Sequence, residues 1–292
     1  MNTLTPLEPL FEVERGSDLP LPPELLALCG RLQLLQHAGR PTVIGNFVST
    51  LDGVVALNDP DHPDGGDISG FNQHDQMLMG LLRAIADAVI VGAGTLRSAP
   101  RHHWTAQHIY PSLAEAYQRL RISLGKPTPP LNVFVTAQGN IRLDLPVFQS
   151  GKVPVLIVTT TQGEARIRAQ HLPASVQLCA VQSTGLLSAR AVLEAVSRVC
   201  KSEVILVEGG PQLMGDFFAE RCLGELFLTL APQVAGRNDL VERPGLVTGK
   251  QFAPEHPLWG TLISVKRGGS HLFLRYAFEA VEQTTSHSQD SF

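Results

Sequence analysis

Glu208 and the two glycines after it stand where an apolar run meets a helical pattern. The stretch VILVEGGPQLMGDFFAE, residues 204–220, predicts a strand, a tight corner and a helix that starts at Pro211. The first N–H groups of such a helix attract anions, so Gly209 and Gly210 favour a phosphate here, although neither common phosphate-loop motif is present. Because Glu208 would repel that phosphate, it indicates a second ligand group beside the first.

A second corner lies in NFVSTLDGVVAL, residues 46–57. It gathers Asn46, Ser49, Thr50 and Asp52 around an Asp-Gly turn. Such a turn is also common at hairpin corners without any functional role, so this segment alone favours turn chemistry over catalysis.

A third corner lies in VIVGAGTLRSAP, residues 89–100. Its glycines at 92 and 94 allow a ligand to approach the backbone, and Thr95 is suited to bind phosphate or to cap a helix. Arg97 occupies the place of the third glycine of a dinucleotide fingerprint, so the Rossmann motif is incomplete. The position of Arg97 is more typical of an exposed surface arginine than of a phosphate ligand.

Arg83 is an unusual residue in GLLRAIADAVIVGAGT, because the helix around it is otherwise apolar. Its two interpretations have equal weight: a snorkelling arginine, or a clamp on a substrate phosphate. The histidines in RHHWTAQHIYP lack a carboxylate or cysteine partner at metal-ligand spacing, so we predict no metal site.

Composition limits the classes of protein that the chain can belong to. The chain has 292 residues, is 43% hydrophobic and has a formal net charge of −4. This charge does not indicate the excess of basic residues that is typical of a nucleic-acid-binding protein. Its apolar runs have the length of strands rather than of membrane spans, and we see no signal peptide. The four widely spaced cysteines favour reduced thiols. We therefore expect a cytoplasmic protein with no nucleic-acid or membrane partner.

Strand and helix patterns alternate along the middle of the chain. A helix is predicted over 22–39, then a strand over 42–57, a helix over 70–87, a strand over 88–95, a loop over 98–112 and a short helix over 113–124. Further alternating segments follow up to a last strand at 271–280. This order predicts an α/β fold with a mostly parallel sheet, flanking helices and an antiparallel hairpin at the end. The simplest division is an N-terminal extension, 1–40, one domain, 41–280, and a flexible tail, 281–292.

Taken in order, four segments resemble the reductase domain of bacterial riboflavin biosynthesis, a family with the dihydrofolate-reductase-like fold. They are NFVSTLDGVVA, DISGFNQHDQMLMGLLRAIADAVIVGAGTLRSAP, ILVEGGPQLMGDFFAERCLGELFLTLAPQVAGR and LFLRY. The similarity spans about residues 43–278. No single motif is decisive, but the ordered set is specific.

The resemblance implies an NADPH-dependent reductase similar to 5-amino-6-(5-phosphoribosylamino)uracil reductase. Hydride transfer to the ribosyl group of such a phosphorylated ribosylaminopyrimidine opens the ribose ring and converts it to ribityl. The resemblance also implies a homodimer. The residues that it marks fall into three groups: catalytic Asp52 and Glu208; cofactor-binding Ala56, Asp67, Gly94, Thr95, Ser98, Gly209, Gly210, Pro211, Gln212, Leu213 and Met214; and substrate-binding Asn46, Ser49, Arg83 and Glu208.

The chain departs from the family pattern at three informative positions. Val54 replaces a basic residue after the Asp-Gly turn, Asp67 replaces a tryptophan, and Ala99 stands where an acid is frequent. Each change affects the substrate side or the nicotinamide region, so cofactor binding is the firmer expectation. Two alternatives stay open: a reductase of a related heterocycle such as a pterin, and an NADPH-binding module without catalysis.

Overall fold

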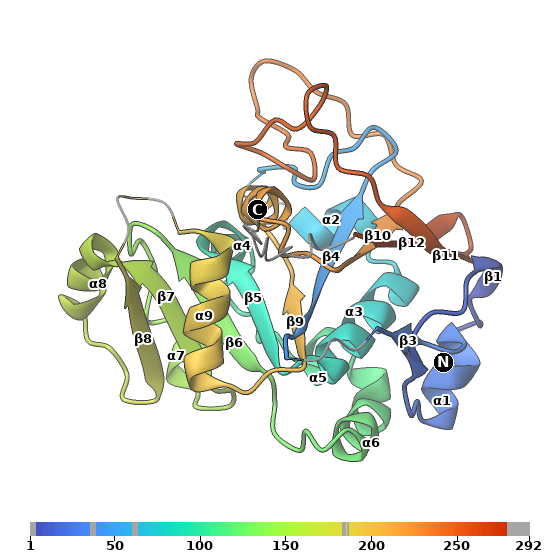
Figure 1. Ribbon diagram of the computed structural model, residues 1–292, viewed down its shortest axis with the longest axis horizontal. Coiled ribbons are helices and arrows are strands. Elements are labelled where there is room, and N and C mark those ends of the chain that lie inside the picture. Colours follow the sequence, from blue (N-terminus) through green and yellow to red (C-terminus); the bar gives the residue numbers. More distant parts are fainter. Residues whose placement is uncertain (1–3, 36–38, 60–63, 183–184, 186, 279–292) are drawn as a thin grey trace, which may run out of the picture.

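A ten-stranded sheet forms the framework of the computed structural model, which describes residues 4–35, 39–59, 64–182, 185 and 187–278 (Figure 1). Its strands lie in the order β1-β11-β12-β10-β4-β9-β5-β6-β7-β8, and β2 and β3 form a separate pair. The strand bounds are β1 Glu8–Glu12, β2 Ser17–Asp18, β3 Gln33–Leu34, β4 Thr42–Ser49, β5 Ala88–Gly92, β6 Leu131–Thr136, β7 Val155–Thr160, β8 Val176–Val181, β9 Val204–Val207, β10 Glu225–Leu230, β11 Thr261–Gly268 and β12 His271–Ala277.

The seven strands from β10 to β8 in this order run parallel to one another. At the other end of the sheet, β12 pairs antiparallel with β10, and β11 and β1 continue the antiparallel pairing. β11 and β12 are consecutive and form the hairpin expected at the end of the chain. The predicted fold class is therefore confirmed.

Helices cover both faces of the parallel part of the sheet (Figure 1). On β5, Val89 and Val91 join one apolar cluster with residues of α3 and α6, while Ala88 and Ile90 join another with residues of α9 and α10. This alternation follows from the two-residue period of a strand. The helix bounds are α1 Pro23–Cys29, α2 Asp64–Ser69, α3 Gln73–Ile85, α4 Ala93–Ser98, α5 Ala106–Ile109, η1 Pro111–Leu113, α6 Ala114–Ser123, α7 Pro146–Gln149, α8 Thr161–Arg168, α9 Ala189–Val199 and α10 Pro211–Ala219.

The N-terminal region differs from the predicted long helix over 22–39. α1 ends at Cys29 because Gly30 adopts a φ of 72°, and the chain then extends into β3. β1, which belongs to the predicted N-terminal extension, joins the main sheet beside β11. The division at residue 40 stays a prediction, and the predicted tail at 281–292 lies outside the described residues.

Two further segments differ from their predicted form. The strand predicted over 42–57 ends at Ser49, and residues 50–57 form a turn and an irregular segment. The loop predicted over 98–112 contains the short helices α5 and η1. Both differences arise where buried side chains hold irregular backbone, as Trp104 does between 98 and 112.

The end of α3, which carries Arg83, is held by a second buried arginine, Arg121 of α6. Arg121 Nη1 donates to the carbonyl oxygens of Arg83, Ala84 and Ala86 at 2.9–3.3 Å, and its Nε and Nη2 donate to Thr128 O. The last carbonyls of a helix have no partners within the helix, so this guanidinium satisfies them. Burial lowers the pKa of Arg121.

Replacing Arg121 by lysine tests this cap. An ammonium cannot reproduce the planar fork, so buried carbonyls lose their donors, and we expect a loss of roughly 1.5–3 kcal/mol in the free energy of unfolding. Arg119→Lys is the matched control, because Arg119 lies on the same helix in a half-exposed pair with Glu24; we expect a change of about 0.5 kcal/mol or less. Equal losses in urea unfolding would contradict the capping role.

Candidate active site

The three corners singled out in the sequence meet at one edge of the sheet. They follow β4, β9 and β5, which are adjacent parallel strands. The carboxyl ends of neighbouring parallel strands share an edge, where ligands bind in open α/β sheets. A cavity of about 350 Å³ opens there, and its lining residues come from these corners and from α2, α3, α4 and the segment 99–109.

A buried ion pair between Arg83 and Glu208 forms part of the cavity wall. Arg83 Nε donates to both carboxylate oxygens of Glu208 at 3.0 Å, and Nη2 donates to Oε2 at 2.7 Å. The side chains are only 3% and 5% exposed. A guanidinium opposite a carboxylate in this geometry holds both groups in fixed orientations.

The remaining nitrogen of Arg83 contacts His102 and Thr105. Nη1 lies 2.6 Å from His102 Nε2 and 3.4 Å from Thr105 O. Burial, together with the charge of Arg83, lowers the pKa of His102 to about 2, so its imidazole is neutral and accepts a hydrogen bond from Arg83. With most of its donors engaged, Arg83 orients Glu208 rather than serving as a free phosphate clamp.

The Gly209–Gly210 corner is narrow and lies against Thr95. The peptide bond between the two glycines is cis, and Gly209 has a φ of 104°. A Cβ at Gly209 would lie 3.2 Å from Thr95 Oγ1, and one at Gly210 would lie 3.5 Å from it. The first hydrogen bond of α10 runs from Met214 N to Gly210 O, so the N–H groups of Gln212 and Leu213 precede the helical ladder. This corner fits a phosphate group.

The cavity brings together nine of the residues predicted for the site: Asn46, Ala56, Arg83, Thr95, Ser98, Glu208, Gly209, Gly210 and Pro211. The side chains of Leu213 and Met214 are buried in the core, so these residues offer a ligand only backbone groups. Gly94, Gln212 and Ser49 are not among the lining residues, and the Ser49 hydroxyl donates to Thr50 O.

Asp52 lies outside the cavity lining, where it joins its turn to a distant loop. Its carboxylate accepts hydrogen bonds from Thr50 Oγ1 at 2.5 Å and from the N–H groups of Ala235 and Gly236 at 3.1 and 2.8 Å. The Thr50 hydroxyl and these N–H groups lower the pKa of Asp52 to about 2. These contacts give the residue a structural role in the turn.

The three departures from the family pattern occupy different environments. Val54 is fully buried in a small apolar cluster with Val48, Ile68 and Ala231, so a side chain here packs rather than faces a ligand. Ala99 lines the cavity. Asp67 lies on α2 outside the lining, and its carbonyl accepts from Gln233 Nε2.

Several lining residues were not predicted from the sequence. Phe47, Met79 and Trp104 give the cavity flat or flexible apolar surface, and Asp75 adds a buried carboxyl group. Trp104 is fixed by Asn132, whose side chain exchanges hydrogen bonds with its backbone N–H and carbonyl. Burial raises the pKa of Asp75 to about 6. An acid in the first turn of a helix normally indicates only helix stabilisation, so no sequence pattern marks Asp75 as a cavity residue.

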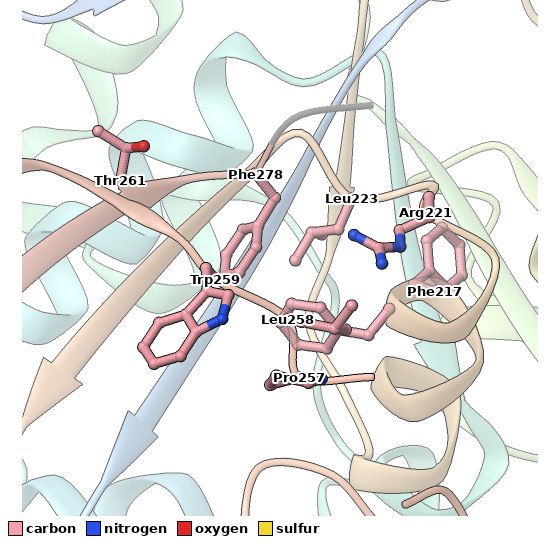
Figure 2. A pocket seen from close by; sticks show the side chains of 9 residues that line it. Phe217, Arg221, Leu223, Pro257, Leu258, Trp259, Thr261 and Phe278 are labelled. Atoms are coloured by element: carbon pink, nitrogen blue, oxygen red, sulfur yellow. The ribbon is translucent and has the colours of Figure 1, made fainter. Parts of the chain in front are cut away.

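A second cavity, of about 320 Å³, lies away from these corners, between α10 and the segment before β11. Figure 2 shows Trp259, Leu258 and Phe278 gathered beside Phe217 and Arg221. Arg221 is the charged residue among those that line this cavity, and its neighbours there are mostly aromatic and aliphatic. Because no carboxylate or histidine accompanies that arginine, this cavity is a weaker candidate for chemistry.

The described part of the chain lacks two kinds of feature. None of the helices in this part of the chain is long and apolar enough to cross a membrane. Among the same residues, no three histidine, cysteine or acidic side chains are arranged to hold a metal ion.

Solved structures similar to this chain share its fold. A pyrimidine reductase-like protein from Corynebacterium diphtheriae is 20% identical, with a TM-score of 0.64 over 82% of this chain and 92% of that one. The riboflavin biosynthesis reductase Rib7 from Saccharomyces cerevisiae is 14% identical, with a TM-score of 0.55 over 84% and 93% of the two chains.

A third structure is the bifunctional diaminohydroxyphosphoribosylaminopyrimidine deaminase and 5-amino-6-(5-phosphoribosylamino)uracil reductase from Thermotoga maritima. It is 19% identical, with a TM-score of 0.58, and the match covers 82% of this chain but 57% of that one. A search of the curated proteins gave no match. The family model of the RibD C-terminal domain matches residues 41–266. This match covers most of the sequence and confirms the resemblance, so the chain belongs to the RibD C-terminal domain family.

Proposed function

We propose that the protein is an NADPH-dependent reductase of a phosphorylated ribosylaminopyrimidine in riboflavin biosynthesis, or of a closely related heterocycle. The observation that carries the proposal is the single cavity in which the Gly209–Gly210 corner and the Arg83–Glu208 pair lie side by side. Membership of the RibD C-terminal domain family supports it. So do the reductase activities for which the yeast and Thermotoga proteins of the same fold are named.

The corner after β9 is the proposed position of a cofactor phosphate. Gly209, Gly210 and Thr95 bound it, and the positive end of α10 points its first N–H groups outward from the helix. When bound, NADPH supplies the hydride. The residues of the chain then need mainly to hold the two rings together and to exclude water.

Glu208 is the proposed substrate ligand. Its two hydrogen bonds with Arg83 Nε and the bond from Nη2 fix the plane of the carboxylate, which leaves lone pairs for ring or ribose N–H and O–H donors. The apolar surfaces of Phe47, Met79 and Trp104 suit a flat heterocycle. The homodimer implied by the resemblance and the cytoplasmic location expected from the composition stay predictions.

The direct test is an assay that follows NADPH absorbance with a panel of riboflavin-pathway and pterin intermediates. Oxidation of NADPH with at least one ribosylaminopyrimidine is the expected result. Tight NADPH binding without turnover of any compound would favour the alternative of a binding module. If calorimetry detected no NADPH binding, both ideas would be wrong.

Gly210→Ala tests the cofactor corner. The backbone accepts a Cβ, since φ is −86° and the nearest neighbour, Thr95 Oγ1, would be 3.5 Å away, but the methyl group occupies the corner. We expect NADPH to bind about tenfold or more weakly, a loss of about 1.4 kcal/mol. Gly245→Ala is the control, with an equally open Cβ position outside the cavity lining. Unchanged NADPH affinity in Gly210→Ala would argue against a phosphate there.

Glu208→Gln tests the substrate side. Glutamine keeps an acceptor but removes a charge, so we expect the affinity for the pyrimidine substrate to fall about tenfold or more and that for NADPH to change about twofold or less. Glu225→Gln is the control, because Glu225 forms a buried pair of the same kind with Arg275 at 2.7 Å outside this cavity.

Both variants weaken a buried ion pair. Removing one partner of such a pair outright lowers the free energy of unfolding by about 3–5 kcal/mol, so both variants should have a lower melting temperature. Only Glu208→Gln should change substrate binding. Parallel losses of substrate affinity in the two variants would mean that Glu208 acts through the stability of the fold.

A further inference from the structure

The second cavity, between α10 and the segment before β11, has walls that are mostly aromatic (Figure 2). Phe217 and Phe218 are buried and form its inner wall, and the ring of Phe218 meets that of Phe278 edge to face, with the centroids 5.1 Å apart. Trp259, in contrast, is 84% exposed. The cavity volume of about 320 Å³ lies within the range of about 300–1,000 Å³ that is usual for small-molecule pockets. Packed rings beside an exposed indole therefore offer apolar surface to a flat molecule.

Arg221, which lines the same cavity, occupies a backbone position at which glycine is favoured. α10 ends in two hydrogen bonds, from Arg221 N to Phe218 O and from Cys222 N to Phe217 O. This pattern places a left-handed residue directly after the helix, most often a glycine, and here Arg221 has a φ of 54°. A side chain raises the free energy of that conformation. The helix end therefore does not explain why an arginine is present.

The guanidinium group of Arg221 has no hydrogen-bond or ion-pair partner among the residues that the structure describes. The neighbouring acids are engaged elsewhere: Glu220 accepts from the first N–H groups of α9 at 2.9 and 3.0 Å, and Asp216 pairs with Lys250 at 3.0 Å. In Figure 2 the guanidinium points away from α10, toward Leu223. No acidic side chain is among the described residues that line the cavity. The cavity thus contains a positive charge without a counter-charge.

Aromatic surface and an unpaired guanidinium together suit one class of ligand. Aromatic rings attract one another in offset or edge-to-face arrangements, and the planar fork of an arginine binds the two oxygens of a carboxylate or phosphate. A flat ring that carries an oxyanion satisfies both parts of the cavity. An uncharged ring would leave the guanidinium unpaired, and a cationic ring would be repelled by it. Because the described lining contains neither a histidine nor a carboxylate, it is suited to binding rather than to acid–base chemistry.

We infer that this cavity is a second ligand site, separate from the candidate active site, which binds a planar aromatic oxyanion such as an aromatic carboxylate. Arg221 binds the oxyanion, and Trp259 covers one face of the ring. The two sites share a helix, because Pro211 at the start of α10 lines the candidate active site, whereas Phe217 and Phe218 near its end line this cavity. The inference does not rest on the proposed function, since it concerns a different cavity.

The test measures the binding of three probes to the full chain by calorimetry. 2-Naphthoate carries the flat ring and the charge, 2-naphthamide keeps the ring without the charge, and decahydro-2-naphthoate keeps the charge without the flat ring. The wild type should bind 2-naphthoate about fivefold or more tightly than the amide. It should also bind 2-naphthoate about threefold or more tightly than the saturated acid. Equal affinities for the three probes, or no binding of 2-naphthoate, would overturn the inference.

Two substitutions should each remove one of these preferences. In Arg221→Gln the affinities for 2-naphthoate and 2-naphthamide should lie within about twofold, while the preference over the saturated acid persists. Trp259→Leu should show the reverse pattern. Both side chains are exposed, so both variants should keep the melting temperature of the wild type. A charge preference retained in Arg221→Gln, or a preference for the flat ring retained in Trp259→Leu, would contradict the assignment.

Arg221→Gly separates ligand binding from the stability of the fold. It should lose the preference for the charged probe, as Arg221→Gln does. Its melting temperature should be equal to that of the wild type or higher, because glycine adopts the left-handed conformation without strain. A lower melting temperature would show that the arginine stabilises the helix end and would remove this argument for a ligand.

Two controls show which cavity the probe occupies. Arg198→Gln is the matched variant, because Arg198 is an exposed arginine in the last turn of α9 outside the cavity lining. Glu208→Gln changes the cavity of the candidate active site. Both variants, and the wild type saturated with NADPH, should bind 2-naphthoate within about twofold of the free wild type. Weaker binding in Glu208→Gln, or competition with NADPH, would place the probe in the candidate active site and overturn the inference.

A second copy of the chain is the other occupant that this cavity could have, and light scattering detects it. The molar mass of Trp259→Leu should equal that of the wild type at the same concentration. If the wild type were an oligomer that dissociated in Trp259→Leu, the cavity would be a contact between copies, and the assignment of a small ligand would be wrong.

Discussion

A guanidinium group in an apolar interior needs an opposite charge and an acceptor for its N–H donors. Arg83 is such a group, and the rest of the structure depends on how its needs are met. Its partners come from separate parts of the chain: Glu208 after β9, and His102 and Thr105 before and at the start of α5. The backbone that carries Arg83 is fixed in turn by Arg121. Because an unmatched buried charge is costly, these segments are stable only when they are assembled together. The cavity wall and the folded core therefore depend on the same contacts.

The cavity has two sides of different character. Around Gly209 and Thr95 the ligand would meet backbone groups and a hydroxyl, which suit phosphate oxygens and recognise little else. Around Glu208 and Asp75 it would meet carboxylates held by specific donors. The two sides of the cavity therefore offer different kinds of contact to a ligand.

The sequence was most informative where the signal was local. A β-branched run, two glycines and a proline are enough to place the corner at Glu208, and an arginine on an apolar helix face marks Arg83 as unusual. The surroundings of Asp75 and Asp52 could not be predicted from the sequence, because residues far along the chain form them. Thr229 and Glu208 complete the environment of Asp75, and Ala235 and Gly236 occupy the carboxylate of Asp52. Likewise, β1 becomes a strand only because β11 pairs with it. No local pattern contains such information.

β1 also protects the border of the sheet that it forms. A free strand edge exposes unpaired N–H and carbonyl groups to which another chain can add. Here the outermost strand has only five residues, contains Pro9, shifts register between Pro9 and Phe11, and carries Glu8 and Glu12 in ion pairs with Arg267 and Lys266. Each of these features interrupts a regular hydrogen-bonding ladder or adds charge beside it. Growth of the sheet from one molecule into the next is therefore disfavoured at this border, and the first residues of the chain contribute to its resistance to aggregation.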